Sequence, residues 1–203
     1  MPKPYTPNDK WSRKAAEEGY RARSVYKLME LDVRYKLLGP GMTVLDLGAA
    51  PGSWMQYSAE QVGPRGRVIG FDLQDIQPIA ENVFLHKQDI TDHEAMKRIL
   101  AEHGVTKVDL VLSDTAPSTS GIHDIDQWQT LELARSVLAV ASLFLRPGGK
   151  CVMKVFRGAD FDEFLRETKR EWDKLKAVKV EASRDRSREV YVVVTKRADA
   201  ARE

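Results

Sequence analysis

Residues 46–54 read DLGAAPGSW, and this short stretch decides the fold. The residues that lead into it, Thr43 to Ala49, form the apolar run of a buried strand, and a helical pattern begins at about Ser53. Small residues lie between the two, and they let a ligand come close to the backbone at the start of a helix. The stretch therefore predicts the first strand and helix of an α/β sheet, with a ligand site at the turn between them.

Outward from this stretch, helix and strand patterns alternate. Apolar residues at helical spacing cover Ser24 to Leu38, Asp126 to Leu145 and Asp160 to Leu175, and we expect Trp128 and Leu175 to face the core. Some strand runs are almost continuously apolar, as expected for strands covered by helices on both faces. The pattern predicts a doubly wound α/β sheet of seven strands: Thr43 to Ala49, Arg67 to Asp72, Val83 to Gln88, Val108 to Ser113, Lys150 to Phe156, Val178 to Glu181 and Val190 to Thr195. The last two runs predict an antiparallel hairpin at one edge.

The size of the chain allows one domain. With 203 residues, 42 % of them hydrophobic, it can build one sizeable core. We expect a basic leader over residues 1–20, one domain over 21–197 and a short tail over 198–203. The net charge of +2 indicates no partner, but basic residues gather at both ends around an acidic middle. A polyanion can be held by the two ends if the fold brings them together, although basic ends also serve solubility.

Cysteine content and hydropathy limit the compartment. Cys151 is the only cysteine, so no internal disulfide forms, and its apolar surroundings favour a buried thiol over a nucleophile. The sequence contains no zinc-binding set. It has neither an apolar run of about 18 residues nor an apolar core for a secretory signal at its start. We therefore expect a cytoplasmic protein with no metal and no membrane partner.

Two acids follow the next two strands. Asp72 ends the second strand, where a carboxylate can accept both hydroxyls of a ribose, and Asp89 ends the third, where it can accept the amine of adenine. The turn at 46–54 lacks both the Gly-x-Gly-x-x-Gly of dinucleotide sites and the lysine of a phosphate-binding loop. These features favour an adenosine-containing cofactor without a pyrophosphate. Taken singly, each acid is also typical of a helix cap.

Further charged residues flank apolar runs. Asp114, in SDTAP at 113–117, ends the fourth strand, and Lys154 lies in an apolar run where an unpaired charge costs several kcal/mol. A lysine that reaches solvent from a strand end is the alternative. Glu189 at the start of the last strand and Lys27 beside the first helical stripe are weak signals on their own.

Together, these residues resemble a known family. Five motifs, RARSVYKL from Arg21, DLGAAPGSW, SDTAP, KVFRG from Lys154 and SREVY from Ser187, are similar in order and spacing to those of the FtsJ/RrmJ family of RNA ribose 2'-O-methyltransferases. The similarity covers roughly residues 12–197. Ser53 stands where several relatives have glycine, and Thr115 occupies a variable position.

The resemblance implies a Rossmann-like, S-adenosylmethionine-dependent methyltransferase fold with an antiparallel last strand. It implies a catalytic tetrad of Lys27, Asp114, Lys154 and Glu189. The candidate residues for binding S-adenosylmethionine are Asp46, Gly48, Ala49, Pro51, Gly52, Trp54, Asp72, Leu73, Asp89, Ile90 and Asp114. SDTAP lacks the Asn/Asp-Pro-Pro-aromatic pattern of amino-group methyltransferases, and no cysteine nucleophile is placed there, which leaves a hydroxyl acceptor.

In the implied mechanism, Lys154 either takes the proton of a ribose hydroxyl as a general base or stabilises the developing alkoxide as a cation. Arginines near the tetrad in the sequence are candidates for RNA phosphates: Arg21, Arg23, Arg184, Arg186 and Arg188. A solvated basic surface is the alternative for each of them.

The compact chain resembles the members that methylate a uridine of large-subunit (23S) ribosomal RNA in the assembled 50S subunit, so we expect that partner and a monomeric enzyme. A methyltransferase acting on a transfer RNA anticodon loop, a catalytically silent RNA-binding assembly factor and a nicotinamide oxidoreductase are the alternatives.

Overall fold

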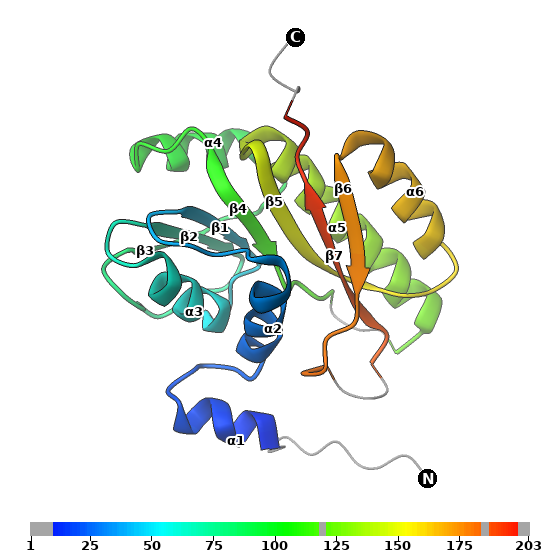
Figure 1. Ribbon diagram of the computed structural model, residues 1–203, viewed down its shortest axis with the longest axis horizontal. Coiled ribbons are helices and arrows are strands. Elements are labelled where there is room, and N and C mark those ends of the chain that lie inside the picture. The colour runs from blue at the N-terminus through cyan, green and yellow to red at the C-terminus, as the bar shows by residue number, and fades with distance from the viewer. Residues whose placement is uncertain (1–9, 118–120, 184–186, 199–203) are drawn as a thin grey trace.

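The computed structural model describes residues 10–117, 121–183 and 187–198. Within them the chain forms one seven-stranded sheet with helices on both faces (Figure 1). The strands are β1 (Thr43–Leu47), β2 (Arg67–Asp72), β3 (Val83–Lys87), β4 (Val108–Ser113), β5 (Leu145–Phe156), β6 (Lys174–Val178) and β7 (Glu189–Thr195). The helices are α1 (Lys10–Glu17), α2 (Val25–Tyr35), α3 (Ser53–Val62), α4 (His93–Glu102), α5 (His123–Phe144) and α6 (Phe161–Glu171).

The strand order is β3-β2-β1-β4-β5-β7-β6, and β7 runs antiparallel to both of its neighbours. The other pairs are parallel. The predicted α/β sheet with an antiparallel last strand is thereby confirmed. The order reverses between β1 and β4, which makes the carboxyl ends of these two strands the expected place for a ligand.

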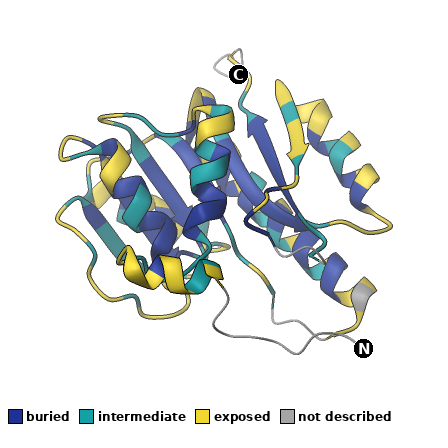
Figure 2. Ribbon diagram, turned by 60° about the horizontal axis from the view of Figure 1, so that its bottom comes forward, coloured by how far each residue is buried: buried dark blue, intermediate teal, exposed yellow. Residues whose placement is uncertain are grey.

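Alternate residues along each strand pack into two separate cores. One core joins the sheet to α4, α5 and α6, and the other joins it to α2 and α3. The central strands are buried on both faces while the helices keep an exposed outer side (Figure 2). This double covering explains why β1 and β4 read as nearly unbroken apolar runs.

Two of the predicted elements near the C-terminus were misplaced. The helix predicted over Asp160 to Leu175 ends at Glu171, and Leu175 lies in β6. The strand predicted over Val178 to Glu181 lies earlier, because Lys174 pairs with Thr195 of β7. A short apolar run fits a helical period and a strand period equally well, so pairing with β7 decides the boundary. The hairpin itself is confirmed.

Trp128 does not face the core. Its side chain is 58 % exposed, whereas Leu131, Ala134 and Val137 of the same helix are buried. Trp128 instead lines the pocket described below.

Part of the predicted leader is helical. Ala15 of α1 is buried, and the ring of Trp11 lies 5.1 Å from that of Tyr26 on α2. No helix among residues 10–117, 121–183 and 187–198 is long and apolar enough to cross a membrane.

Candidate active site

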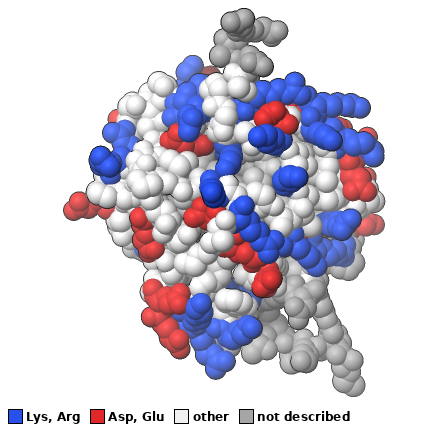
Figure 3. Space-filling view, viewed as in Figure 1, with Lys and Arg blue, Asp and Glu red and all other residues white. Residues whose placement is uncertain are grey.

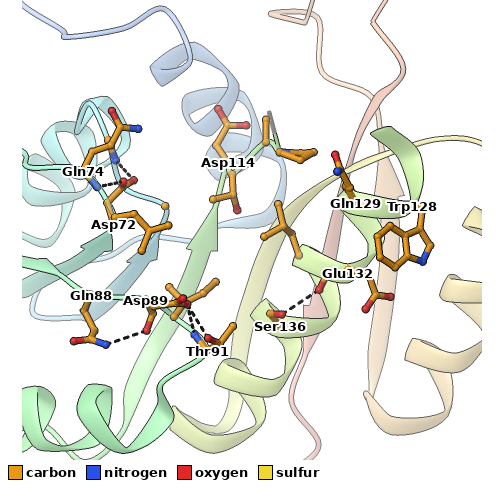
Figure 4. A pocket seen from close by; sticks show the side chains of 18 residues that line it. Asp72, Gln74, Gln88, Asp89, Thr91, Asp114, Trp128, Gln129, Glu132 and Ser136 are labelled. Atoms are coloured by element: carbon orange, nitrogen blue, oxygen red, sulfur yellow. Dashed lines mark hydrogen bonds between the residues drawn. The ribbon is translucent and has the colours of Figure 1, made fainter. Parts of the chain in front are cut away.

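A cavity of about 840 Å³ opens at the carboxyl ends of β1 to β4 (Figure 4). Residues from the turn after β1 and from the ends of β2, β3 and β4 form one side, and α5 forms the other. Six residues of the predicted cofactor set line it: Gly48, Asp72, Leu73, Asp89, Ile90 and Asp114. The structure therefore brings together residues that lie far apart in the sequence.

The two acids at the ends of β2 and β3 hold backbone loops. Asp72 accepts the amide N–H groups of Ala50 at 2.9 Å and Gln74 at 2.8 Å, and so fixes the turn after β1. Asp89 accepts both the amide and the hydroxyl of Thr91, which lowers its pKa below the ordinary value. Neither acid caps a helix, because no helix lies between β2 and β3 and because Asp92, not Asp89, caps α4. This finding removes the helix-cap interpretation of both.

Gly48 lies against Thr115 and has no room for a side chain. Its φ is +71°, and a Cβ atom at this position would lie 1.9 Å from Cγ2 of Thr115. The amides of Gly48 and Ala49 donate to the carbonyl of Phe71, which fastens the turn to β2. Only glycine allows the turn after β1 to come this close to Thr115, which follows β4.

Asp46 does not line the pocket, and its carboxylate oxygen Oδ2 is buried with no hydrogen-bond partner among the described residues. Burial raises the pKa of this carboxyl to about 8, and the charges of Asp114 and Asp72 add to the effect. Three other acids, Asp72, Asp89 and Asp114, line the cavity itself, and their negative charges favour a ligand that carries positive charge. These carboxylates, which can accept hydrogen bonds from hydroxyl and amino groups, therefore fit a positively charged adenosine cofactor.

The remaining predicted cofactor residues do not line the cavity. The carbonyl of Pro51 accepts a hydrogen bond from Arg21, and Gly52 precedes α3 with a φ of +105°. Trp54 is buried, and its indole N–H donates to the carbonyl of Ser24 at 2.8 Å. These three residues join the turn to α2 and to the segment before it.

The four residues of the predicted tetrad form two ion pairs. Lys27 Nζ lies 2.5 Å from Glu189 Oε1, with side chains 9 % and 13 % exposed. Lys154 Nζ lies 3.2 Å from Asp114 Oδ1 and donates to the Asp114 carbonyl at 2.6 Å. Burial on its own would raise the pKa of Glu189, but the charge and hydrogen bond of Lys27, with help from Ser187 and Lys154, lower it below its ordinary value.

Tyr191 joins the two pairs, and the sequence reading missed it as a site residue. Its hydroxyl donates to Asp114 Oδ1 at 2.6 Å, and its ring lies 5.9 Å from Lys27 Nζ. Burial raises the pKa of Tyr191 well above the ordinary value, and the charges of Asp114 and Glu189 add to this. The alternation of β7 is the signal that could have found it, because Tyr191 lies two residues after Glu189 and so on the same face.

Comparison with known proteins agrees with this geometry. Residues 20–197 match the model of the FtsJ-like methyltransferases. The chain belongs to this family. A protein of Syntrophobacter fumaroxidans named ribosomal RNA large subunit methyltransferase E is 48 % identical over 190 residues, which are 93 % of this chain and 95 % of that protein. A protein of the same name from Pseudomonas fluorescens is 39 % identical over 186 residues, 92 % of this chain and 88 % of that protein.

Solved structures resemble this FtsJ-like methyltransferase as well. A crystal structure of a Plasmodium falciparum protein assigned as a ribosomal RNA methyltransferase superposes with a TM-score of 0.77 at 27 % identity, covering 88 % of this chain and 99 % of that one. A Clostridium thermocellum protein assigned as an rRNA methylase gives a TM-score of 0.58 at 21 % identity, over 84 % and 96 % of the two chains, and shares the fold.

The ion pair of Lys27 with Glu189 joins two residues 162 positions apart, so a segment near the start of the chain meets one near its end at the candidate active site. Lys and Arg side chains also gather over the half of one face formed by β5, β7 and β6 (Figure 3). The guanidinium of Arg21 donates to the carbonyls of Pro51, Gln77 and Pro78, which ties it to the loop after β2.

The other predicted RNA-binding arginines are differently placed. Arg188 is half-buried beside Glu189, and its carbonyl accepts the amide of Arg157. Arg23 is half-buried in the segment before α2. Arg184 and Arg186 lie outside the described residues.

Helix α5 forms one side of the cavity, and none of its lining residues was predicted from the sequence. Trp128, Gln129, Glu132 and Ser136 line the pocket from its second turn onward (Figure 4). Spacing on a helix shows that such residues share a face, but it does not show which cavity they face.

Proposed function

We propose that this protein transfers a methyl group from S-adenosylmethionine to the ribose 2'-hydroxyl of a uridine in large-subunit (23S) ribosomal RNA, in the assembled 50S subunit. One observation carries the proposal: Asp114 lines the cavity and is also the partner of Lys154 and Tyr191. The cofactor pocket and the tetrad thus share a residue, so the methyl donor and the acceptor hydroxyl meet beside Asp114.

The pocket residues would hold the cofactor as follows. Asp72 would accept the ribose hydroxyls and Asp89 the adenine amine, with Gly48 giving the backbone approach. Leu73 and Ile90 line the same end of the cavity and would pack against the adenine. When bound, S-adenosylmethionine supplies a methyl group already activated by its sulfonium charge. The protein then has to position the acceptor and to manage its proton.

Lys154 Nζ donates to the carbonyl of Asp114 at 2.6 Å and lies 3.2 Å from its carboxylate, which holds the amino group beside the cavity that Asp114 lines. From this position we assign Lys154 the role of the cation that stabilises the negative charge on the ribose oxygen while the hydroxyl proton passes to water. Asp114 holds Lys154 in place together with the Tyr191 hydroxyl. The Lys27 and Glu189 pair completes the wall of this site and places a second cation and carboxylate near the acceptor.

The choice of RNA rests on the relatives. Proteins 39 to 48 % identical to this chain over about nine-tenths of its length carry the name ribosomal RNA large subunit methyltransferase E. A transfer RNA anticodon loop is the second candidate. The complete pairing of the tetrad supports an active enzyme over a silent assembly factor. A monomeric, cytoplasmic enzyme stays a prediction.

The test is transfer of labelled methyl from S-adenosylmethionine to three substrates: 50S subunits, free ribosomal RNA and transfer RNA. We expect label on ribosomal RNA, most efficiently in the subunit. Lys154→Ala should abolish transfer and leave cofactor affinity nearly unchanged, whereas Lys176→Ala, an exposed lysine of β6, should behave as the wild type. Label on transfer RNA alone would overturn the substrate, and near-normal turnover of Lys154→Ala would overturn the role of the tetrad.

A further inference from the structure

A second groove, of about 630 Å³, lies next to the active site. It is formed by the segment between β5 and α6, the start of α6, the end of β6 and the start of β7. Its lining residues include three basic side chains, Arg157, Lys179 and Arg188. Of these, only Arg188 was expected from the sequence to contact RNA.

The three cations of this groove have no acidic partner among the residues that the structure describes. Within the described part of the chain, none of Arg157, Lys179 and Arg188 is in a salt bridge, in contrast to the paired Arg34, Arg135 and Arg146. One acid, the exposed Asp162 in the first turn of α6, lines the same groove. Arg157 lies 6.0 Å from the ring of Phe161, which helps to hold its guanidinium. The groove is therefore positively charged and ready for an anion.

The floor of the groove is apolar. Phe161 and Val190 are 4 % and 7 % exposed, and Leu165 and Ala177 complete the surface. An inorganic ion needs no such floor. A cationic rim over an apolar floor suits a nucleotide, whose phosphate meets the cations while its sugar and base cover the apolar side chains.

The groove shares a wall with the catalytic tetrad. Ser187 lines it and donates to Glu189 Oε2 at 2.7 Å. The amide of Arg157 donates to the carbonyl of Arg188, one residue before Glu189, and Phe156 pairs with Glu189 across β5 and β7. Paired strands lie about 5 Å apart. The backbone atoms of Arg157 and Arg188 are therefore within a few ångströms of the backbone of Glu189.

We infer that this groove binds a nucleotide of the substrate RNA that neighbours the methylated one, with Arg157, Lys179 and Arg188 on its backbone phosphate. The inference rests on the proposed function, because the acceptor ribose must lie at Lys154. RNA held on the far side of Glu189 would be fixed at two points, the target ribose and the neighbouring phosphate. Such a grip orients the 2'-hydroxyl without touching the cofactor.

The test compares Arg157→Gln/Lys179→Gln with a matched loss of two charges, Lys97→Gln/Arg98→Gln, on the exposed side of α4. Binding of a fluorescently labelled oligouridylate is measured by anisotropy between 50 and 200 mM salt, a range that resolves phosphate contacts. We expect the groove variant to bind about tenfold more weakly and its salt slope to fall by about 1.4, which is two single-strand phosphate contacts. Arg157→Lys/Lys179→Arg, which keeps both charges, should retain the wild-type slope.

Methyl transfer to large subunits separates this inference from the proposed function. We expect the groove variant to raise KM for the subunit, with kcat at saturating RNA within about twofold of the wild type and cofactor affinity unchanged, because no tetrad residue is altered. A salt slope equal to that of the α4 variant, in an enzyme that still methylates ribosomal RNA, would overturn the groove alone. A wild-type protein that transfers no methyl group to any RNA would overturn the proposed function instead.

Discussion

Replacement of Lys27 by methionine would leave the Glu189 carboxylate buried without its closest cation. The pair is 2.5 Å long and both side chains are about nine-tenths buried. Removing one member of a buried pair costs about 3–5 kcal/mol. Ser187 and Lys154 still act on Glu189, so we expect the lower end, about 3 kcal/mol, at pH 7. With a urea m-value near 3 kcal/mol/M, which is the upper end for small proteins, the unfolding midpoint falls by about 1 M.

The loss of stability in Lys27→Met should depend on pH. The folded protein lowers the pKa of Glu189, so the carboxylate contributes stability above its ordinary pKa of 4.5, and this contribution is lost as the pH falls through the lowered value. Without Lys27, burial raises the pKa of Glu189, so the difference between wild type and Lys27→Met shrinks as the pH falls from that raised value to the lowered wild-type value. Urea unfolding of both proteins at neutral and acidic pH measures it.

Two further variants make the test of this pair specific. Lys87→Met removes a cation from an exposed pair with Asp75 and should cost less than about 1 kcal/mol. Lys27→Met/Glu189→Leu removes both charges and should be more stable than Lys27→Met alone. An equal loss at both pH values, or a double variant that is less stable than the single one, would refute this account of the pair.

Two more predictions concern the cofactor pocket. Folded Asp46 has its pKa raised to about 8, so it binds a proton more tightly than the unfolded chain and wild-type stability falls as the pH rises from about 4 to about 8. Asp46→Asn should remove this fall in thermal unfolding of the cofactor-free protein, and an identical pH dependence would contradict it. Gly48→Ala should abolish cofactor binding in calorimetric titration, because its Cβ would overlap Thr115, whereas Gly63→Ala, with a φ of +66° and no atom near its Cβ, should bind normally. Equal affinities of the two variants would contradict the close approach at Gly48.

The fold was predictable from the sequence where the apolar residues of a segment follow only one spacing, that of a helix or that of a strand. The buried β1 and β4 and the helix α2 show clear patterns, and each lies within a few residues of its predicted bounds. The boundary between α6 and β6 was not predictable, because Trp172 and Leu175 suit either element and only pairing with β7 separates them.

The site was predictable where residues sit at strand ends. Asp72, Asp89 and Asp114 meet in one cavity because carboxyl ends of neighbouring parallel strands share an edge. The pairing of Lys27 with Glu189 and the place of Tyr191 between the pairs depend on how α2 packs on β7, which local patterns do not contain. For the same reason the contacts of Arg21 with three backbone carbonyls were not foreseen.

The position of the transferred methyl group on the RNA tests the central claim most directly. Alkali cleaves RNA through the 2'-hydroxyl, so a ribose methylated there protects the next linkage. After incubation of 50S subunits with the enzyme and S-adenosylmethionine, we predict one alkali-resistant linkage in the large ribosomal RNA, at a uridine, and none with Lys154→Ala. A methyl group found on a base, in RNA whose linkages alkali cleaves throughout, would contradict the account.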